Sequence, residues 1–106
     1  MNDVKKIVQF SPDAMADHAE EASQLMRVLA NPNRLLILCI LSKGEVTVSE
    51  LNAAVGLSQS ALSQHLSVLR HEGLVDTRRE SQNIYYRLAE GPAVDVIHTL
   101  HNLYCG

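Results

Sequence analysis

Apolar and polar residues follow a helical period between positions 57 and 75. The polar residues recur at steps of three and four positions, and they are Ser60, Ser63, Gln64, Ser67 and His71. Leu62, Leu66 and Leu69 form an opposite, apolar stripe, so this segment is predicted to be an amphipathic helix. One face can pack on a core, whereas the other carries short hydrogen-bonding side chains of the kind that contact base edges in a DNA major groove.

A second, shorter helix is predicted directly before this one. Thr47 and Glu50 have the spacing of a capping box, which starts a helix that runs through Val55. Gly56 can take the left-handed conformation that ends a helix, and Ser58 is a good N-cap for the next one. The pattern therefore predicts a helix, a tight turn and a second helix.

Beyond Gly73 the period changes from helical to extended. Residues 75–80 and 84–88 alternate as strands do, and the polar residues 81–83 separate them, which predicts a β-hairpin. The side chains expected to face inward are Ile84, Tyr86 and Leu88. The cations expected to reach phosphates beside the groove are Arg78, Arg79 and Arg87. The predicted fold is mainly α with a small β-hairpin wing, a winged helix-turn-helix.

An alternative is that residues 57–75 form an ordinary surface helix with a solvated Ser/Gln face. The serines in this segment argue against it, because Ser lowers helix propensity where a solvated helix would favour Glu, Lys or Ala. They are Ser58, Ser60, Ser63 and Ser67. A local rule broken in this way indicates function.

The remaining helices indicate how the domain is assembled. Ser11-Pro12, Asn31-Pro32 and Gly91-Pro92 are helix-start signals, and the run 35–41 is apolar all round, which predicts a central, buried helix. The first helix has an apolar stripe of Met15, Ala19, Ala22, Met26 and Leu29, and the last has one of Ala93, Ile97, Leu100 and Tyr104. These stripes are candidates for a symmetric dimer interface. Packing of both within one chain stays open, because periodicity does not separate core from interface.

Length and charge constrain these predictions. A chain of 106 residues fits one domain, and we expect an N-terminal tail over residues 1–12 and a DNA-binding and dimerisation domain over 13–106. The net charge of −3 excludes a broadly basic surface. Four of the six arginines lie between positions 70 and 87, so DNA binding should be local to a few phosphates and sensitive to salt.

The longest apolar run is far shorter than the roughly 20 residues that a membrane-spanning helix needs, and the first ten residues lack the apolar stretch of a signal peptide. We therefore expect a cytoplasmic protein that does not contact the membrane. In that compartment the two cysteines should be reduced at rest.

Three segments together resemble the ArsR family of bacterial transcriptional regulators over residues 22–105. They are LANPNRLLILCIL, SELNAAVGLSQSALSQHLSVLRHEGLV and RRESQNIYYRL. The chain is most similar to the branch of HlyU, BigR and SqrR, in which one cysteine lies in the second helix and another ends the last. Cys39 and Cys105 match those positions. The resemblance implies a homodimer, joined through the first and last helices, that binds an inverted repeat in promoter DNA with recognition helices about 34 Å apart.

The resemblance also implies which side chains contact DNA. The candidates on the recognition helix are Gln59, Ser60, Ser63, Gln64 and His65. In the wing, Arg78 and Arg79 are the candidates for backbone contacts, and Gln82 is the candidate for the minor groove. His65 could instead close the edge of the core, and His71 is expected to interact with the helix dipole.

Metal sensing is the other activity that the family suggests, but its motifs are incomplete in this chain. The thiols of the arsenic and cadmium type are absent from residues 50–54, and the Asp-x-His of the zinc type is absent from residues 90–92. His98 and His101 leave a two-ligand remnant, which makes a weak site. We therefore predict no metal and no other cofactor.

The two cysteines predict a dithiol switch. One thiolate attacks an oxidised or sulfane sulfur species and the other resolves the product, which leaves a disulfide or polysulfide link. The resemblance implies persulfides and polysulfides as inducers, with peroxide or disulfide stress left open. The inert alternative is that Cys39 packs as a small hydrophobe. Cys105 is expected to be more accessible, one helical turn after His101.

These features predict a sequence-specific regulator, a repressor, whose dithiol alters DNA binding. One alternative is a regulator without thiol switching that activates transcription by displacing a silencing protein. Another is an enzyme that carries persulfide. The chain has no Cys-x-x-Cys, no Gly-rich phosphate loop and no recognisable set of nucleophile, base and orienting residue, so we predict that it is not an enzyme.

Overall fold

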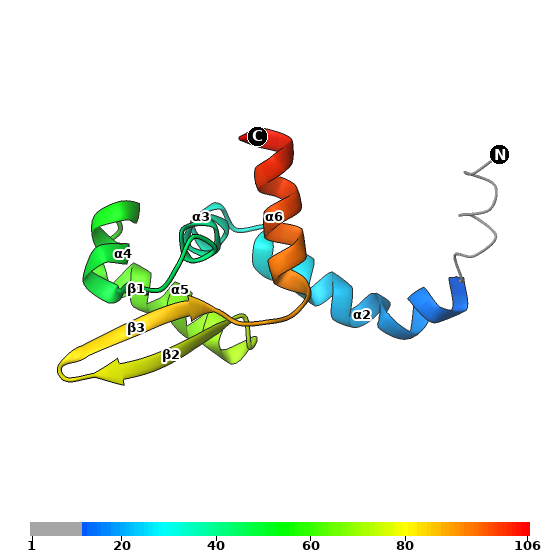
Figure 1. Cartoon of the computed structure of the whole chain (residues 1–106). Helices are drawn as coiled ribbons and strands as arrows, with labels where there is room; N and C mark the ends of the chain where they lie inside the picture. Colours follow the sequence, from blue (N-terminus) through cyan, green and yellow to red (C-terminus); the bar gives the residue numbers. More distant parts are fainter. Residues whose placement is uncertain (1–11) are drawn as a thin grey trace.

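The computed structural model describes residues 12–106, which form five helices and a three-stranded antiparallel sheet (Figure 1). In chain order the elements are α2 (Pro12–Leu29), α3 (Pro32–Leu41), β1 (Val46–Thr47), α4 (Val48–Val55), α5 (Gln59–His71), β2 (Val75–Glu80), β3 (Asn83–Leu88) and α6 (Pro92–Tyr104). The helix-turn-helix is α4 and α5, and the hairpin of β2 and β3 is the wing. The winged helix-turn-helix prediction is therefore confirmed. Ser11 and the rest of the predicted tail lie outside the described residues, except Pro12.

The starts of α3 and α4 are capped by nearby side chains, as the sequence predicts. Asn31 caps α3, and its side chain accepts hydrogen bonds from the backbone N–H of Asn33 and Arg34 at 2.9 and 3.1 Å. The capping box at the start of α4 is present in both directions, since Thr47 Oγ1 accepts from Glu50 N at 3.1 Å and Glu50 Oε1 accepts from Thr47 N at 3.1 Å. These bonds satisfy N–H groups that have no partner within the helix.

The tight turn between α4 and α5 also follows the predicted chemistry. Gly56 ends α4 in the left-handed conformation, with φ of 67°, which costs glycine little because it has no Cβ. Ser58 then caps α5, and its Oγ accepts from the backbone N–H of Ala61 at 3.2 Å. The two caps orient α5 relative to α4.

The sheet differs from the prediction in two places. The hairpin turn is one residue shorter than predicted, because Asn83 already pairs with Glu80 and belongs to β3. Strand β1 was not predicted, and it pairs with β3 on the side away from β2, with Val46 opposite Tyr86. Two residues are too few to display strand alternation, so only the pairing partner reveals this strand.

The core lies where α3 packs against α4, α5 and α6. Its fully buried side chains are Ile37, Leu38, Leu51, Leu62, Leu69 and Ile97, and Tyr86 joins them from the wing, as predicted. Helix α3 is central but not buried all round, since Leu36 is 45% exposed. Ile84 lies on the same sheet face as Tyr86 but is 36% exposed, which corrects the prediction that it faces the core. The wing extends beyond the core at this point (Figure 1).

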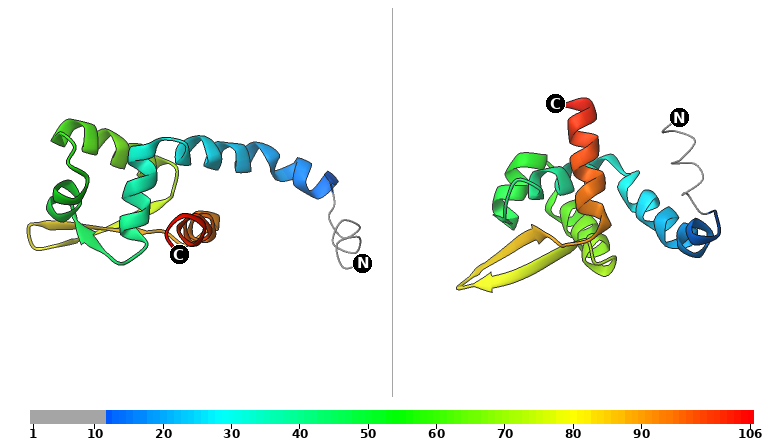
Figure 2. Two further views of the ribbon diagram at one scale, coloured as in Figure 1. Left: turned by 90° about the horizontal axis from the view of Figure 1, so that it is seen from above. Right: turned by 45° about the vertical axis from the view of Figure 1, so that its right-hand side comes forward.

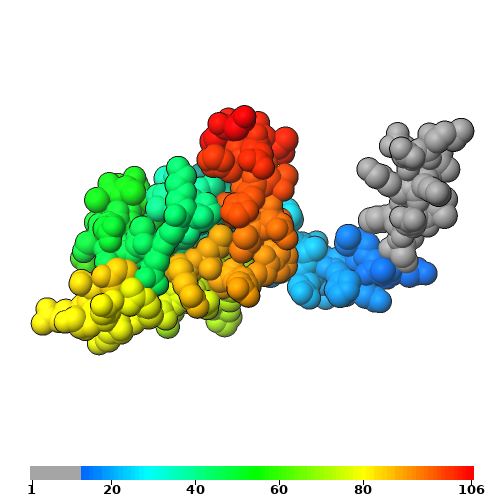
Figure 3. All heavy atoms as spheres, viewed as in Figure 1, coloured from blue at the N-terminus to red at the C-terminus, as the bar shows by residue number. Residues whose placement is uncertain are grey.

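Helix α2 projects away from the rest of the molecule (Figures 2 and 3). Its stripe residue Leu29 is buried at the C-terminal end, whereas Met15 and Met26 are 47% and 52% exposed. On α6 the stripe begins with the buried Ala93 and Ile97 and ends with Tyr104, which is 84% exposed. Among the described helices, none is both long and apolar enough to cross a membrane.

Candidate nucleic-acid interface

Helix α5 presents a polar face that is held in place by an apolar one. Leu62, Leu66 and Leu69 are buried against the core, so the helix has little freedom to rotate. The predicted base-contacting residues Gln59, Ser60, Ser63 and Gln64 are exposed, and His65 is half-buried. An anchored helix with an exposed row of hydrogen-bonding groups has the form that enters a major groove.

A groove of about 580 Å³ separates α5 from the wing, and we call it the wing groove. Its lining residues are Val48, Ser63, Leu66, Ser67, Arg70, His71, Ile84 and Tyr86. Ser67 and Arg70 were not among the predicted DNA contacts. The polar stripe of the sequence already contained Ser67, whereas Arg70 lies at the border of that stripe and only the facing wing shows its position.

The strand register places Arg78 and Arg79 on opposite faces of the wing. Directly paired residues of antiparallel strands share a face, and Arg79 pairs with Ile84, which lines the wing groove. Arg78 pairs instead with Tyr85, on the other face. Within the described chain, neither Arg79 nor the Arg70 of the groove forms an ion pair, so no carboxylate of the described residues compensates either cation.

Arg78 is bound by two carboxylates of its own chain. Its Nη2 lies 2.7 Å from Glu45 Oε1, its Nε donates to both oxygens of Glu45 at 2.9 and 3.0 Å, and its Nη1 donates to Glu80 at 2.6 Å. Its guanidinium also lies 4.4 Å from the ring centre of Tyr85. The hydrogen bonds that Arg78 donates to Glu45 and Glu80 raise the pKa of Arg78 above its usual value, and the bond accepted from Arg78 lowers the pKa of Glu45. Much of the Arg78 charge is thus compensated by carboxylates of its own chain.

Two other predicted wing residues are exposed. Arg87 has a weak ion pair, with its Nη2 3.7 Å from Asp76 Oδ2, and an exposed pair of this kind contributes little energy. Gln82 is exposed at the hairpin turn, next to Ser81, whose φ of 57° is the positive value that closes the turn. The turn carries Gln82 at the outermost point of the wing.

The two cysteines line one pocket of about 460 Å³, which we call the thiol pocket. Its lining residues are Leu36, Cys39, Ile40, Lys43, Gly44, Glu45, Val46, His101 and Cys105. Cys39 comes from α3 and is half-buried, whereas Cys105 follows α6 and is exposed. Burial raises the pKa of the Cys39 thiol, and the nearby Cys105 raises it further. The fold therefore brings together two residues that are far apart in the sequence.

Comparison with known proteins identifies the family. Residues 31–77 match the model of the family described as "Bacterial regulatory protein, arsR family". They run from the N-cap of α3 into β2. The Biofilm growth-associated repressor of Agrobacterium fabrum is 47% identical over 92 residues, which are 87% of this chain and 79% of that protein. The chain belongs to the ArsR family.

Other ArsR-type proteins are similar to this chain in sequence and in structure. Transcriptional activator HlyU of Vibrio cholerae is 46% identical over 91 residues, or 86% of this chain and 84% of that protein. The crystal structure of the transcriptional repressor BigR from Xylella fastidiosa has a TM-score of 0.84 and 38% identity, and the match covers 92% of this chain and 99% of that one. This ArsR-family chain is a DNA-binding transcriptional regulator.

In the described part of this ArsR-family chain, the fold does not complete a metal site around His98 and His101. His101 lines the thiol pocket, whereas His98 is exposed and does not. Over residues 12–106, no three His, Cys, Asp or Glu side chains are grouped so that they could hold a metal ion. The prediction of no metal therefore stays a prediction for the whole chain.

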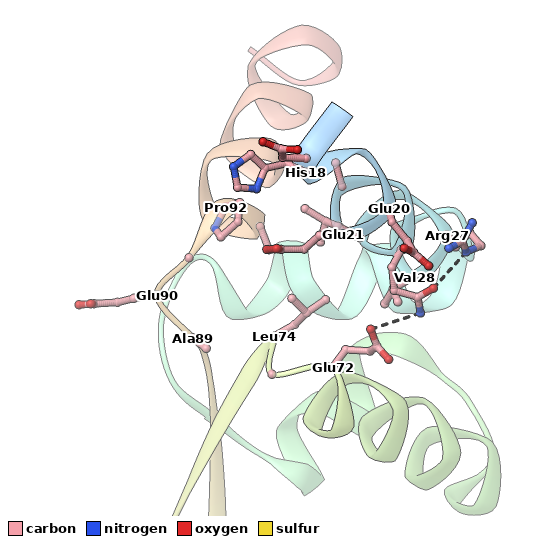
Figure 4. Close-up of a pocket in the computed structure, with 17 residues that line it drawn as sticks. His18, Glu20, Glu21, Arg27, Val28, Glu72, Leu74, Ala89, Glu90 and Pro92 are labelled. Carbon is pink, nitrogen blue, oxygen red and sulfur yellow. Dashed lines mark hydrogen bonds between the residues drawn. The ribbon is translucent and has the colours of Figure 1, made fainter. Parts of the chain in front are cut away.

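A further cavity of about 740 Å³ lies between α2, the end of α5 and the start of α6 (Figure 4). Gln24 bridges two of these elements, since its Nε2 donates to Glu72 at 3.3 Å and its Oε1 accepts from Arg27 at 3.0 Å. The carboxylates that line the cavity are Asp17, Glu20, Glu21, Glu72 and Glu90. Clustered carboxylates disfavour phosphate at this cavity.

Proposed function

We propose that this ArsR-family regulator is a homodimeric repressor that binds an inverted repeat in promoter DNA and releases it when Cys39 and Cys105 react with a persulfide. The observation that carries the proposal is the thiol pocket, in which one cysteine comes from the central helix α3 and the other from the end of α6. We infer that it acts in the cytoplasm, where bacterial promoters are.

DNA binding is assigned to three parts of the surface. Gln59, Ser60, Ser63, Gln64 and His65 face base edges in the major groove. A phosphate strand follows the wing groove, where Arg70 and Arg79 bind it. Gln82, at the wing turn, reaches the adjacent minor groove. Because few cations take part, the affinity depends on a small number of phosphate contacts.

The dimer is assigned to α2 and α6. Helix α2 projects from the body with Met15 and Met26 exposed, and the end of α6 exposes Leu103 and Tyr104. Burial of such apolar area on association contributes roughly 25 cal/mol per Å². A symmetric pair would cover both faces and place two copies of α5 on one side of a DNA duplex.

The proposed thiol reaction has two steps, the attack of Cys105 on a persulfide and the attack of Cys39 on the product. The thiolate of exposed Cys105 attacks the outer sulfur of a persulfide R–S–SH, whose S–S bond breaks so that RS⁻ leaves and Cys105–S–SH forms. The Cys39 thiolate then attacks the inner sulfur of Cys105–S–SH and expels HS⁻, which leaves a disulfide. Two thiols are oxidised, the outer sulfur is reduced to sulfide, and the two thiol protons end on RSH and H₂S.

The consequence for DNA follows from the position of α3. This helix packs against both α4 and α5, while α6 is assigned to the dimer interface. A covalent link between α3 and α6 would change the angle between the interface and the recognition helices. Since the half-sites are one DNA turn apart, a change in that angle prevents both copies of α5 from entering the groove together.

The test is fluorescence anisotropy of the reduced protein on its own promoter DNA, repeated with a persulfide donor and, separately, with Zn²⁺. We expect wild-type protein to lose affinity with the donor only, and C39S and C105S to bind DNA but to ignore the donor. Mass spectrometry should find a product that has lost two hydrogens. Release of both mutants by the donor would reject the dithiol switch, and release by Zn²⁺ alone would point to His98 and His101.

Activation of transcription is the second candidate, because the relative HlyU, at 46% identity, is named a transcriptional activator. In that case the protein binds DNA without thiol switching and displaces a silencing protein. A promoter reporter distinguishes the two, since deletion of the repressor raises expression and deletion of the activator lowers it. Repeated turnover of persulfide without any DNA binding would instead indicate a carrier enzyme.

A further inference from the structure

Glu45 belongs to two sites at once. Its side chain is the main partner of Arg78 in the wing, through contacts of 2.7, 2.9 and 3.0 Å. The same residue lines the thiol pocket beside Cys39 and Cys105. The other carboxylate that binds Arg78, Glu80, does not line this pocket, so of these two carboxylates only Glu45 connects Arg78 to the thiol pocket.

The connection from Cys39 to Glu45 is short and hydrogen-bonded. Ser42 Oγ donates to the carbonyl oxygen of Cys39 at 2.6 Å, and the backbone N–H of Gly44 donates to Leu41 at 3.2 Å. Residues 43–46 then form a continuous wall of the thiol pocket. A change at Cys39, or a group that enters the pocket, therefore acts directly on this wall.

The wall is also joined to the wing by backbone pairing. Val46 and Thr47 form β1, which pairs with Tyr86 and Tyr85 of β3. Glu45, just before β1, reaches past this central strand to Arg78 of β2, which lies over Tyr85. The ion pair thus holds the outer strand β2 to the pocket wall and orients the whole hairpin, including Arg79 on its other face.

We propose that Glu45 is a positioning residue that couples the thiol pocket to the DNA-binding wing. In the reduced protein Glu45 holds Arg78 and keeps the wing oriented for phosphate contact. When Cys105 is drawn to Cys39, the wall 43–46 shifts, the hold on Arg78 is lost, and the wing loses its orientation. This inference rests on the proposed function, because it supplies the route by which the thiol reaction reaches DNA.

Glu80 provides a matched control. E45Q and E80Q each remove one negatively charged partner of Arg78, but of these two carboxylates only Glu45 lines the pocket. The quantity to measure is the ratio of the DNA Kd after persulfide treatment to the Kd before it. We expect E45Q to weaken binding by the reduced protein and to lower this ratio by about threefold to tenfold. E80Q should keep the wild-type ratio.

A second readout separates coupling from simple loss of structure. Coupling between two sites is reciprocal, so bound DNA should slow the reaction of the cysteines in wild-type protein and in E80Q. In E45Q that protection should be largely lost, while thermal melting shows that the variant is folded.

The outcomes are distinguishable. If the wild-type Kd ignores the donor, the proposed function is rejected and the coupling falls with it. If the wild type responds and E45Q responds equally, with equal protection by DNA, only the role of Glu45 is overturned. If E45Q and E80Q lose the response to the same extent, the effect comes from the charge on Arg78 and not from the pocket wall, which also overturns it.

Discussion

Substitution of Arg79 should reduce the salt dependence of DNA binding, whereas substitution of its neighbour Arg78 should not. The side chain of Arg79 lies on the wing-groove face and has no ion pair within the described chain. Arg78 lies on the other face, between Glu45 and Glu80. The two variants R79Q and R78Q remove the same charge from adjacent positions, so each is a control for the other.

The magnitude follows from the number of phosphates. One phosphate contact contributes a slope of about 0.9 to the dependence of log K on log salt, so two wings in a dimer contribute about 1.8. Between 50 and 200 mM salt, R79Q should therefore lose roughly tenfold less affinity than wild type loses. R78Q should weaken binding at every salt concentration, because the wing loses its contact with Glu45 and must be ordered when DNA binds. Its slope should stay close to the wild-type value, because Arg79 still reaches its phosphate in the complex and the charge of Arg78 is already compensated.

The assay is anisotropy of labelled promoter DNA, titrated at four or five salt concentrations with reduced protein. Circular dichroism melts show that both variants are folded, which matters because R78Q also breaks the contact with Glu45. A slope that falls equally in both variants would refute the argument from strand faces. A slope that falls only in R78Q would show that Arg78 leaves Glu45 and Glu80 and binds a phosphate when DNA is present.

Other predictions concern the cap, the thiols and the exposed helix. T47A should lower the free energy of unfolding by about 1 kcal/mol, because the capping box with Glu50 is lost. The control T47S keeps the hydroxyl and should have the melting temperature of wild type. A T47A variant that also melts at the wild-type temperature would refute the role of the cap. Iodoacetamide should label exposed Cys105 before Cys39, as peptide mass mapping would show; equal rates would contradict the burial of Cys39. The raised pKa of Cys39 means that folding favours its neutral thiol, so this contribution to stability is present below the ordinary value of 9.0 and is lost as the pH rises above it. Denaturant unfolding at alkaline pH should accordingly show a smaller loss in C39S than in wild type. M26E should shift the protein toward the monomer in analytical ultracentrifugation, whereas a charge at exposed Gln59, as in Q59E, should not; an unchanged M26E dimer would exclude α2 from the interface.

Much of the candidate site could be predicted because it depends on neighbours in the chain. The polar and apolar stripes of α5 follow from a period of 3.6 residues, and the caps at Thr47 and Ser58 need only backbone N–H groups three positions away. These interactions are local, so the residues that make them can be recognised without knowledge of the fold. The hairpin was predicted for the same reason, apart from one residue at its turn.

The sequence by itself therefore determined the helix-turn-helix, the wing and the chemical types on the α5 surface. Tertiary structure alone decided how the two faces of the wing are oriented, so that Arg79 lies on the face toward the groove while Arg78 contacts Glu45, 33 positions away. It also decided that Ile84 stays exposed, that β1 exists, and that Cys39 and Cys105 share a pocket with Glu45. The physical reason is that these outcomes depend on partners brought together by packing of the core, and no periodicity within a segment encodes the position of a distant partner.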